Sequence, residues 1–331
     1  MHIVITSRYV YRSRGEGMKN NFKNLIFVTN MGEDTISVID LLSMREIYKI
    51  KLNSNCLLSI ENKPALGPHD AVLDYNNRYL YVTNSHDSSI SVVDLIQNKV
   101  IQTISAGSCP SHIEVCKKNK MIYVTNTDSN SISVLSLTSG ELLTQIPTGS
   151  MPHDLKLSKD CKKLYVTNLH PNKLNIIDIA TNEIESSIDV NLNPYHMTFN
   201  KDGTLIFVVN TSFSNMERGS ITIIDAKKFK IVEKIKVGKM LMGAVLGKDE
   251  NFLYITDAEL NAVSVLDLKE GKIIDRIYVG RMPGSISIDK DNKYLFVCDV
   301  QDNTLSIIDI KKHRLIKSIQ VGIEPSSIVS I

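Results

Sequence analysis

One short apolar string that ends in Asn or Asp recurs seven times along the chain and limits the possible folds more than any other feature. The copies, of which LYVTN is typical, end at Asn30, Asn84, Asn126, Asn168, Asn210, Asp257 and Asp299. They are spaced 54, 42, 42, 42, 47 and 42 residues apart. Each is followed by a polar turn and by two further strand-like strings, such as ISVVD and VIQTI. Short β-branched strands repeated every 42 residues or so are typical of the blades of a β-propeller.

A further strand precedes each of the last six copies and begins at Pro68, Pro110, Pro152, Pro194, Leu241 and Pro283, and a similar string begins at Pro325 near the end of the chain. The first copy has no such strand before it, whereas the chain ends with EPSSIVSI and no successors. We therefore predict an all-β, seven-bladed propeller of four-stranded antiparallel blades, closed by the C-terminal strand as the innermost strand of blade 1. The string HIVITSRYVY, residues 2–11, is an alternative for that place.

The repeat also revises the number of domains, because a length of 331 residues alone would favour two. We predict an N-terminal extension at 1–20 and one propeller domain at 21–331. Blade 1 combines 24–52 with 325–331, and blades 2–7 extend from 67 to 321. We expect the Asn or Asp that ends each string to bond the backbone of the turn that follows it.

The strings resemble the YVTN repeats of a family of seven-bladed propellers, and the resemblance covers residues 24–331. It implies the fold but no single activity, because propellers include binding proteins, lyases, lactonases and oxidoreductases. The sequence is also distantly similar to the histidine-lined propeller of nitrous-oxide reductase and to virginiamycin B lyase. It contains no separate cupredoxin domain of the kind that the reductase carries.

Composition excludes several classes of partner. The formal net charge is only +2 and no apolar run approaches a membrane span, so we expect neither nucleic-acid nor membrane binding. Five cysteines without a C-x-x-C pair, and arginines in the first residues in place of a signal peptide, predict a cytoplasmic protein with reduced thiols. We expect a monomer that acts on a small molecule or a peptide.

Six of the eight histidines fall on one face of the predicted propeller, called here the top face, where the innermost strands begin and the second strands end. They are His69, His112, His153 and His196 after the prolines, and His86 and His170 after the VTN strings. Blades 2 and 4 begin Pro-His-Asp, and blades 3 and 5 begin Pro-x-His, so the pattern repeats every 84 residues.

Strand alternation predicts which of these side chains face the central axis. The third and fifth residues after each proline are mostly apolar, so the second and fourth should line the axis. This places Asp70, His112, Asp154 and His196 around a channel, with His69 and His153 at its mouth.

Imidazoles and carboxylates that converge in this way suit a transition-metal site or a metal-free acid/base site. A structural origin is also open, because a single histidine can cap a turn and an ancestral two-blade duplication would produce the alternation without a function.

Two insertions and several soft ligands also map to the top face. The insertions are 53–66 and 211–219, and the second contains Phe213 and Arg218. Long loops on a regular scaffold often bind ligands. Six methionines map to this face, and thioether and imidazole ligands together favour copper. Alternatively, the methionines anchor loops. They are Met31, Met151, Met216, Met240, Met242 and Met282.

The leading hypothesis is a metal-dependent enzyme of the oxidoreductase type, with copper first and iron or zinc next. His69, His112, His153 and His196 would bind the metal, and His69, Asp70, His153 and Asp154 would be catalytic. The expected substrate-contacting or supporting residues are His86, His170, Tyr195, Cys109, Phe213 and Arg218. One alternative is a metal-free lyase or lactone-opening enzyme with His–Asp pairs as acid and base, and another is a non-catalytic interaction module.

Overall fold

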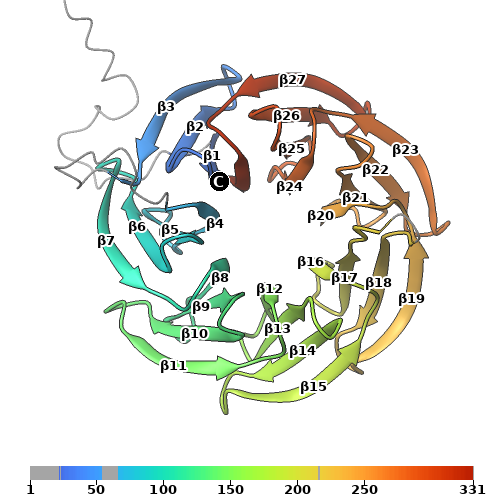
Figure 1. Ribbon diagram of the computed structural model, residues 1–331. Helices are drawn as coiled ribbons and strands as arrows, with labels where there is room; N and C mark the ends of the chain where they lie inside the picture. The colour runs from blue at the N-terminus through green and yellow to red at the C-terminus, as the bar shows by residue number, and fades with distance from the viewer. Residues whose placement is uncertain (1–21, 23, 54–65, 215–216, 331) are drawn as a thin grey trace, which may run out of the picture.

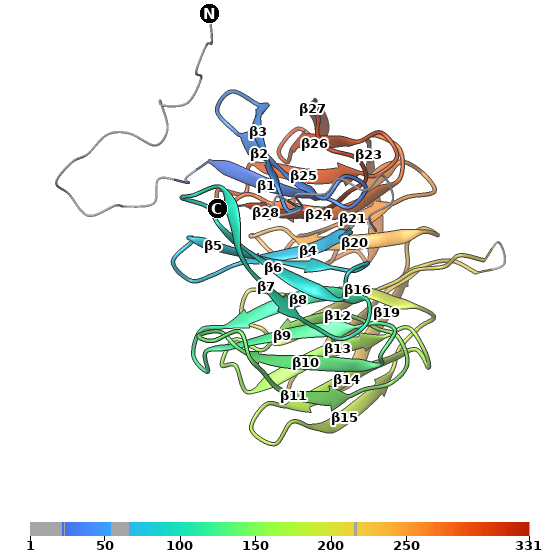
Figure 2. The same cartoon turned by 60° about the vertical axis from the view of Figure 1, so that its left-hand side comes forward.

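The computed structural model describes residues 22, 24–53, 66–214 and 217–330. Seven four-stranded antiparallel sheets stand around a central axis and form a closed ring (Figures 1 and 2). The predicted all-β, seven-bladed propeller is confirmed. Within these ranges, no helix is long and apolar enough to cross a membrane.

The strands nearest the axis and their neighbours carry the repeated motifs. The innermost strands are β4 (Pro68–Leu73), β8 (Pro110–Cys116), β12 (Pro152–Leu157), β16 (Pro194–Phe199), β20 (Leu241–Leu246), β24 (Pro283–Ile288) and β28 (Pro325–Ser330). The second strands are β1 (Leu25–Asn30), β5 (Tyr79–Asn84), β9 (Met121–Asn126), β13 (Lys163–Asn168), β17 (Leu205–Asn210), β21 (Phe252–Asp257) and β25 (Tyr294–Asp299).

The two outer strands of each blade complete the sheets. The third strands are β2 (Thr35–Asp40), β6 (Ser89–Asp94), β10 (Ser131–Ser136), β14 (Lys173–Asp178), β18 (Ser220–Asp225), β22 (Ala262–Asp267) and β26 (Thr304–Asp309). The outermost strands are β3 (Arg45–Lys51), β7 (Lys99–Ser105), β11 (Leu142–Pro147), β15 (Glu183–Asp189), β19 (Lys230–Lys236), β23 (Lys272–Tyr278) and β27 (Arg314–Gln320).

The two ends of the propeller meet in blade 1, where the strand order is β28-β1-β2-β3. Strand β28 pairs antiparallel with β1, with Ile26 opposite Ser330 and Asn30 opposite Pro325. The predicted closure by the C-terminal strand is therefore confirmed, and it removes a free sheet edge at the seam. The alternative strand at 2–11 and the predicted extension at 1–20 lie outside the described residues.

The apolar core consists of layers between neighbouring blades. The third residue after each proline is buried there, as with Ile113, Leu155 and Met197. The opposite parity therefore faces the axis, as strand alternation predicts.

Each innermost strand starts with a β-bulge at the top face. Between the proline and the third residue after it, the strand has one residue more than its partner, as between Pro68 and Ala71 opposite Asn84 and Val82. The threonine of the VTN string holds this extra residue in five blades: Thr125 Oγ1, for example, accepts the N–H of His112 at 3.0 Å. The same hydroxyl donates to the carbonyl of His153 in the next blade at 2.7 Å. The repeated threonine thus joins two blades and shapes the strand start.

The Asn at the end of the second strand does not act as predicted. Asn126 is fully buried, and its Nδ2 donates to the hydroxyls of Ser131 and Ser133 on the neighbouring strand. Its Oδ1 accepts the N–H of Gly107 from the preceding loop. The prediction of a bond to the following turn is wrong for this Asn, because an amide can satisfy both of its polar atoms inside the blade. It holds for Asp257, whose Oδ1 accepts the N–H of Glu259 at 3.1 Å.

Asp299 has the same place in blade 7, and its charge destabilises the folded ring. Burial raises the pKa of Asp299 to about 6, so the folded state favours the protonated carboxyl. Stability from this group is greatest at acidic pH and falls as the pH rises through about 6. We expect Asp299→Asn to raise the free energy of unfolding at pH 8 by on the order of 2 kcal/mol. Urea unfolding at pH 5 and pH 8 measures this, with exposed Asp291→Asn as control, and an equal effect of the two variants would contradict it.

Candidate functional site

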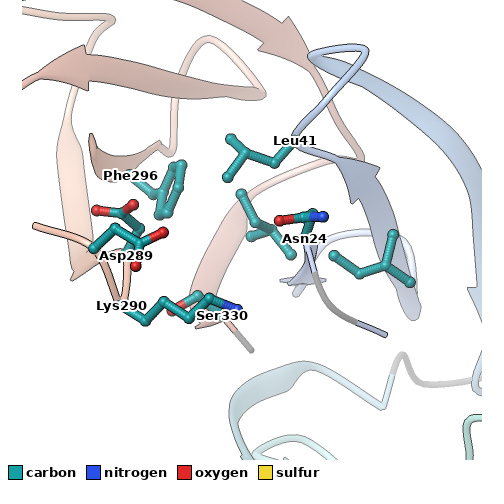
Figure 3. A pocket seen from close by; sticks show the side chains of 9 residues that line it. Asn24, Leu41, Asp289, Lys290, Phe296 and Ser330 are labelled. Carbon is teal, nitrogen blue, oxygen red and sulfur yellow. The ribbon is translucent and has the colours of Figure 1, made fainter. Parts of the chain in front are cut away.

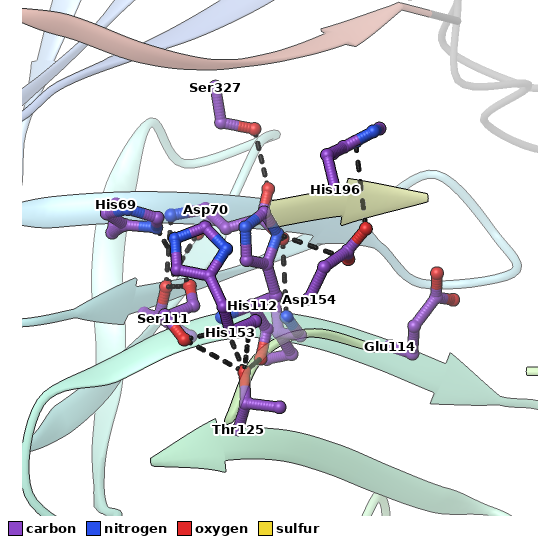
Figure 4. Close-up of polar contacts among 12 residues, drawn as sticks. His69, Asp70, Ser111, His112, Glu114, Thr125, His153, Asp154, His196 and Ser327 are labelled. Atoms are coloured by element: carbon purple, nitrogen blue, oxygen red, sulfur yellow. Dashed lines mark hydrogen bonds and ion pairs between the residues drawn. The ribbon is translucent and has the colours of Figure 1, made fainter. Parts of the chain in front are cut away.

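A cavity of about 460 Å³ opens at the top face, between the starts of the innermost strands. This volume is within the usual range for small-molecule sites. All four histidines that follow the prolines line it, together with Tyr195 and Lys156. The histidines and their carboxylate neighbours come from four successive blades, β4, β8, β12 and β16 (Figure 4).

Blades 2 and 3 form one paired unit. His69 Nδ1 lies 3.1 Å from the carbonyl oxygen of Ser111, so Nδ1 carries a proton and Nε2 has the free lone pair. Asp70 Oδ2 lies 3.2 Å from His112 Nδ1 and accepts the N–H of Ile113. The carboxylate therefore holds both the strand and the imidazole of the next blade.

Blades 4 and 5 repeat this arrangement 84 residues later. His153 Nδ1 lies 2.7 Å from the carbonyl oxygen of Tyr195, and the two rings are stacked with centroids 3.9 Å apart. Asp154 Oδ2 accepts the N–H of Met197 at 2.7 Å and lies 3.8 Å from His196 Nε2. His196 Nδ1 is buried without a hydrogen bond, so this ring is held less firmly than that of His112.

His112 links the two units. Its Nδ1 is also 3.6 Å from Asp154 Oδ1, so the ring lies between two carboxylates. The His112 ring centroid is 5.3 Å from that of His69 and 4.9 Å from that of His153. Sequence alternation placed Asp154 on the channel; it is instead fully buried behind His112 and does not line the cavity.

The four imidazoles have different protonation states because their neighbours differ. Burial, with the nearby imidazole of His112, lowers the pKa of His69 to about 4. Burial lowers the pKa of His196 to about 4 and that of His153 well below its usual value. Burial acts on His112 in the same direction, but Asp154 and Asp70 outweigh it and raise its pKa. The cavity thus combines one imidazole whose protonated form is favoured with three whose neutral form is favoured.

One further charge pair lines the axis. Lys156 Nζ lies 2.9 Å from Glu114 Oε1. Burial disfavours the charge of Lys156, but Glu114, Asp154 and Asp70 raise its pKa above the usual value. Strand alternation predicted that the residues at these positions face the axis, but it did not indicate that Lys156 and Glu114 belong to the site.

Sequence reasoning missed Ser327, whose hydroxyl donates to Asp70 Oδ1 at 2.6 Å. The sequence contains one indication of this contact, because Ser327 lies two residues after Pro325, in the strand that closes the ring.

Five other candidate residues do not line the cavity, whereas Met31, Met242 and Met282 do. His86 and His170 are exposed, although His86 is close enough to His69 to act on its pKa. Phe213 and Arg218 lie within the second insertion and are exposed. Cys109 is half-buried, and burial raises the pKa of its thiol. Most of the first insertion, 54–65, lies outside the described residues.

The described side chains do not fit a metal ion as they lie. Among them, no group of three or more His, Cys, Asp or Glu residues forms a site that could hold one. The Nδ1 atoms of His69 and His153 face carbonyl oxygens, and that of His112 faces carboxylates. The expected copper, iron or zinc centre stays a prediction.

A second, much smaller hollow lies between blades 7 and 1, beside Asn24, Leu41, Asp289 and Phe296 (Figure 3). Its volume is about 30 Å³, enough for one or two water molecules. It is too small for a substrate.

Two family models match separate parts of the chain. Residues 21–185 match the model described as "Lactonase, 7-bladed beta-propeller". Residues 206–327 match that of the cytochrome D1 heme domain. Both matches agree with the β-propeller fold of the chain. A search of curated proteins found no match.

Solved structures of several propellers are similar to this one. Hydrazine synthase from Kuenenia stuttgartiensis is 19% identical with a TM-score of 0.74, over 83% of this chain and 91% of that chain. A putative 6-phosphogluconolactonase from Bacteroides fragilis is 16% identical with a TM-score of 0.73, over 93% and 98%. Dihydro-heme d1 dehydrogenase NirN is 14% identical with a TM-score of 0.68, over 92% and 75%. Likeness at these identities establishes the fold alone.

The two hydrogen bonds of the Thr125 hydroxyl, called here the threonine bridge, can be tested by substitution. Thr125→Val leaves the N–H of His112 and the carbonyl of His153 without this hydroxyl. Thr256→Val does the same to the N–H of Gly243 in blade 6 and the carbonyl of Gly284 in blade 7. We expect both variants to lose about 1–3 kcal/mol of unfolding free energy. Only Thr125→Val should lower the pKa of His112, measured by histidine NMR titration. Equal His112 titration in the two variants would contradict a role of the bridge in the site.

Metal analysis tests the predicted centre. Protein purified without a His tag and incubated with Cu(II), Fe(II) or Zn(II) is compared with the His112→Ala/His196→Ala double variant. The prediction requires about one bound equivalent in the parent protein and a loss in the variant. Less than about a tenth of an equivalent in the parent would refute it.

Proposed function

We propose that the chain is an enzyme that opens a lactone or a related small ester by metal-free acid/base catalysis in the top-face cavity. The supporting observation is the pairing of the His112 imidazolium with the neutral imidazoles of His69 and His153 on one cavity wall. The match of 21–185 to a lactonase model favours lactone opening over a lyase reaction and over a non-catalytic interaction module. The lyase and the interaction module stay predictions.

The proposed base is His69 or His153. Each has its Nδ1 proton directed at a backbone carbonyl oxygen, which leaves Nε2 as the basic atom. This Nε2 takes a proton from a water molecule while the water oxygen adds to the substrate carbonyl carbon. Their low pKa values keep both groups unprotonated near neutral pH.

The proposed acid is His112. With Nδ1 directed at the carboxylates of Asp70 and Asp154, the Nε2–H of its imidazolium is available to the substrate. Its Nε2–H first donates a hydrogen bond to the carbonyl oxygen that gains negative charge, and the proton is then transferred to the leaving oxygen as the ring C–O bond breaks. The product is a hydroxy acid, and the proton taken from water returns through solvent to His112. The nearby carboxyl groups of Asp154 and Asp70 stabilise the imidazolium.

Substitution of His112 tests its role as the acid. We expect His112→Ala to lower kcat/KM for hydrolysis of small five- and six-membered lactones by about 10²–10⁴-fold, measured by hydroxy-acid release. The exposed top-face variant His170→Ala should retain full activity. Loss of activity in the parent protein on chelation, or no lactone opened at all, would refute the proposal.

The pH profile follows from the two kinds of imidazole. On the acid side, the base is protonated only as the pH approaches about 4, so activity should persist at pH 5. On the alkaline side, activity should fall as His112 loses its proton above pH 6.5, because its pKa is raised. The profile of kcat/KM between pH 4 and 9 measures both limbs. An acid limb near pH 6.5 would contradict this assignment.

A further inference from the structure

The wall of the cavity opposite the histidines has a different chemistry. Blades 6, 7 and 1 contribute thioether and aliphatic side chains there, from Met31, Met242, Met282, Val300 and Ile328. None of the three methionines is fully buried, so their side chains are accessible from the cavity. The cavity is therefore two-sided, with the imidazoles on blades 2–5 and the three methionines on the rest of the ring, where Ser285, Ser287, Glu324, Ser326 and Ser327 also line it.

A glycine makes room along this apolar wall. Gly284 directly follows Pro283 and has the place that His69 and His153 have after their prolines. It lines the cavity without a side chain, and a Cβ there would lie 3.3 Å from Val300. The missing side chain leaves room beside Val300 for part of a ligand.

The charges of the cavity do not favour a phosphorylated substrate. Its cations are already matched, because Lys156 pairs with Glu114 and His112 lies between Asp70 and Asp154. Among the described lining residues there is no arginine. Phosphate recognition normally uses arginines or unpaired cations, which can form bidentate hydrogen bonds with the phosphate oxygens.

We propose that the substrate is an uncharged lactone or ester with an aliphatic substituent. Its carbonyl group faces His69, His112 and His153, and its aliphatic part lies along Met31, Met242 and Met282. Methionine suits this surface because its flexible thioether adapts to chains of different shape. This inference rests on the proposed function for the reaction, but the aliphatic specificity can be measured by binding alone.

The sequence offers a matched pair of variants. Met151 and Met282 each directly precede the proline of an innermost strand, and both have a positive φ, of 54° and 56°. Met282 lines the cavity, whereas Met151 is exposed and does not. Met282→Ser removes part of the apolar wall, and Met151→Ser makes the same chemical change outside it.

The experiment uses the full chain and a series of γ-lactones with alkyl substituents of one to eight carbons, beside 6-phospho-glucono-δ-lactone. The corresponding γ-lactams, which resist opening, report binding by calorimetry. We expect kcat/KM for the lactones and affinity for the lactams to rise up to about fourfold per methylene until the wall is covered. Met282→Ser should flatten both trends, and Met151→Ser should leave them unchanged.

The outcomes separate the two proposals. Preference for the phosphorylated lactone, or the same response of Met282→Ser and Met151→Ser, would overturn the aliphatic specificity while leaving lactone opening intact. Chain-length-dependent lactam binding that Met282→Ser abolishes, without opening of any lactone, would support the specificity and refute the proposed reaction. Lactam binding that does not change with chain length would overturn the inference.

Discussion

The hydroxyl of a repeated threonine connects the blades to one another and to the candidate site. Strand hydrogen bonds run within each blade, so the ring needs other polar contacts between blades. Thr83, Thr125 and Thr256 each accept a bulge N–H of their own blade and donate to a carbonyl of the next. Because these are the backbone groups of the residues just after the prolines, the contact that joins the blades also fixes the start of each cavity-lining strand.

The carboxylates of Asp70 and Asp154 have both a structural and an electrostatic effect. Each accepts a backbone N–H of the next blade and lies close to the imidazole of that blade. Burial of four imidazoles in one place favours their neutral forms. Only His112, which both carboxylates approach, has a raised pKa. The nearby carboxylates therefore distinguish His112, whose protonated form they favour, from the other three imidazoles.

The seven repeated strings predicted the fold. The missing innermost strand of blade 1 predicted that the C-terminal strand closes the ring. The sequence also predicted that His69, His112, His153 and His196 would gather at one face, since strand parity and repeat spacing determine position around a propeller. It could not predict which of them are neutral, because this depends on distances of a few ångströms between side chains of different blades. Nor could it predict the burial of Asp154, because this depends on side chains of neighbouring blades that lie over it, such as that of His112 at 3.6 Å.

The odd number of blades explains why the site has two sides. A pattern that alternates every second blade cannot continue unbroken around seven blades, so it must be interrupted somewhere in the ring. In this chain the two paired units occupy blades 2–5, and blades 6, 7 and 1 have Met242, Gly284 and Ser326 at the place of the first residue of the pattern. The polar units are held by contacts across blade boundaries. Blade 1 joins them through Ser327, whose hydroxyl donates to Asp70, and the methionines and glycine of blades 6, 7 and 1 line the cavity opposite the histidines.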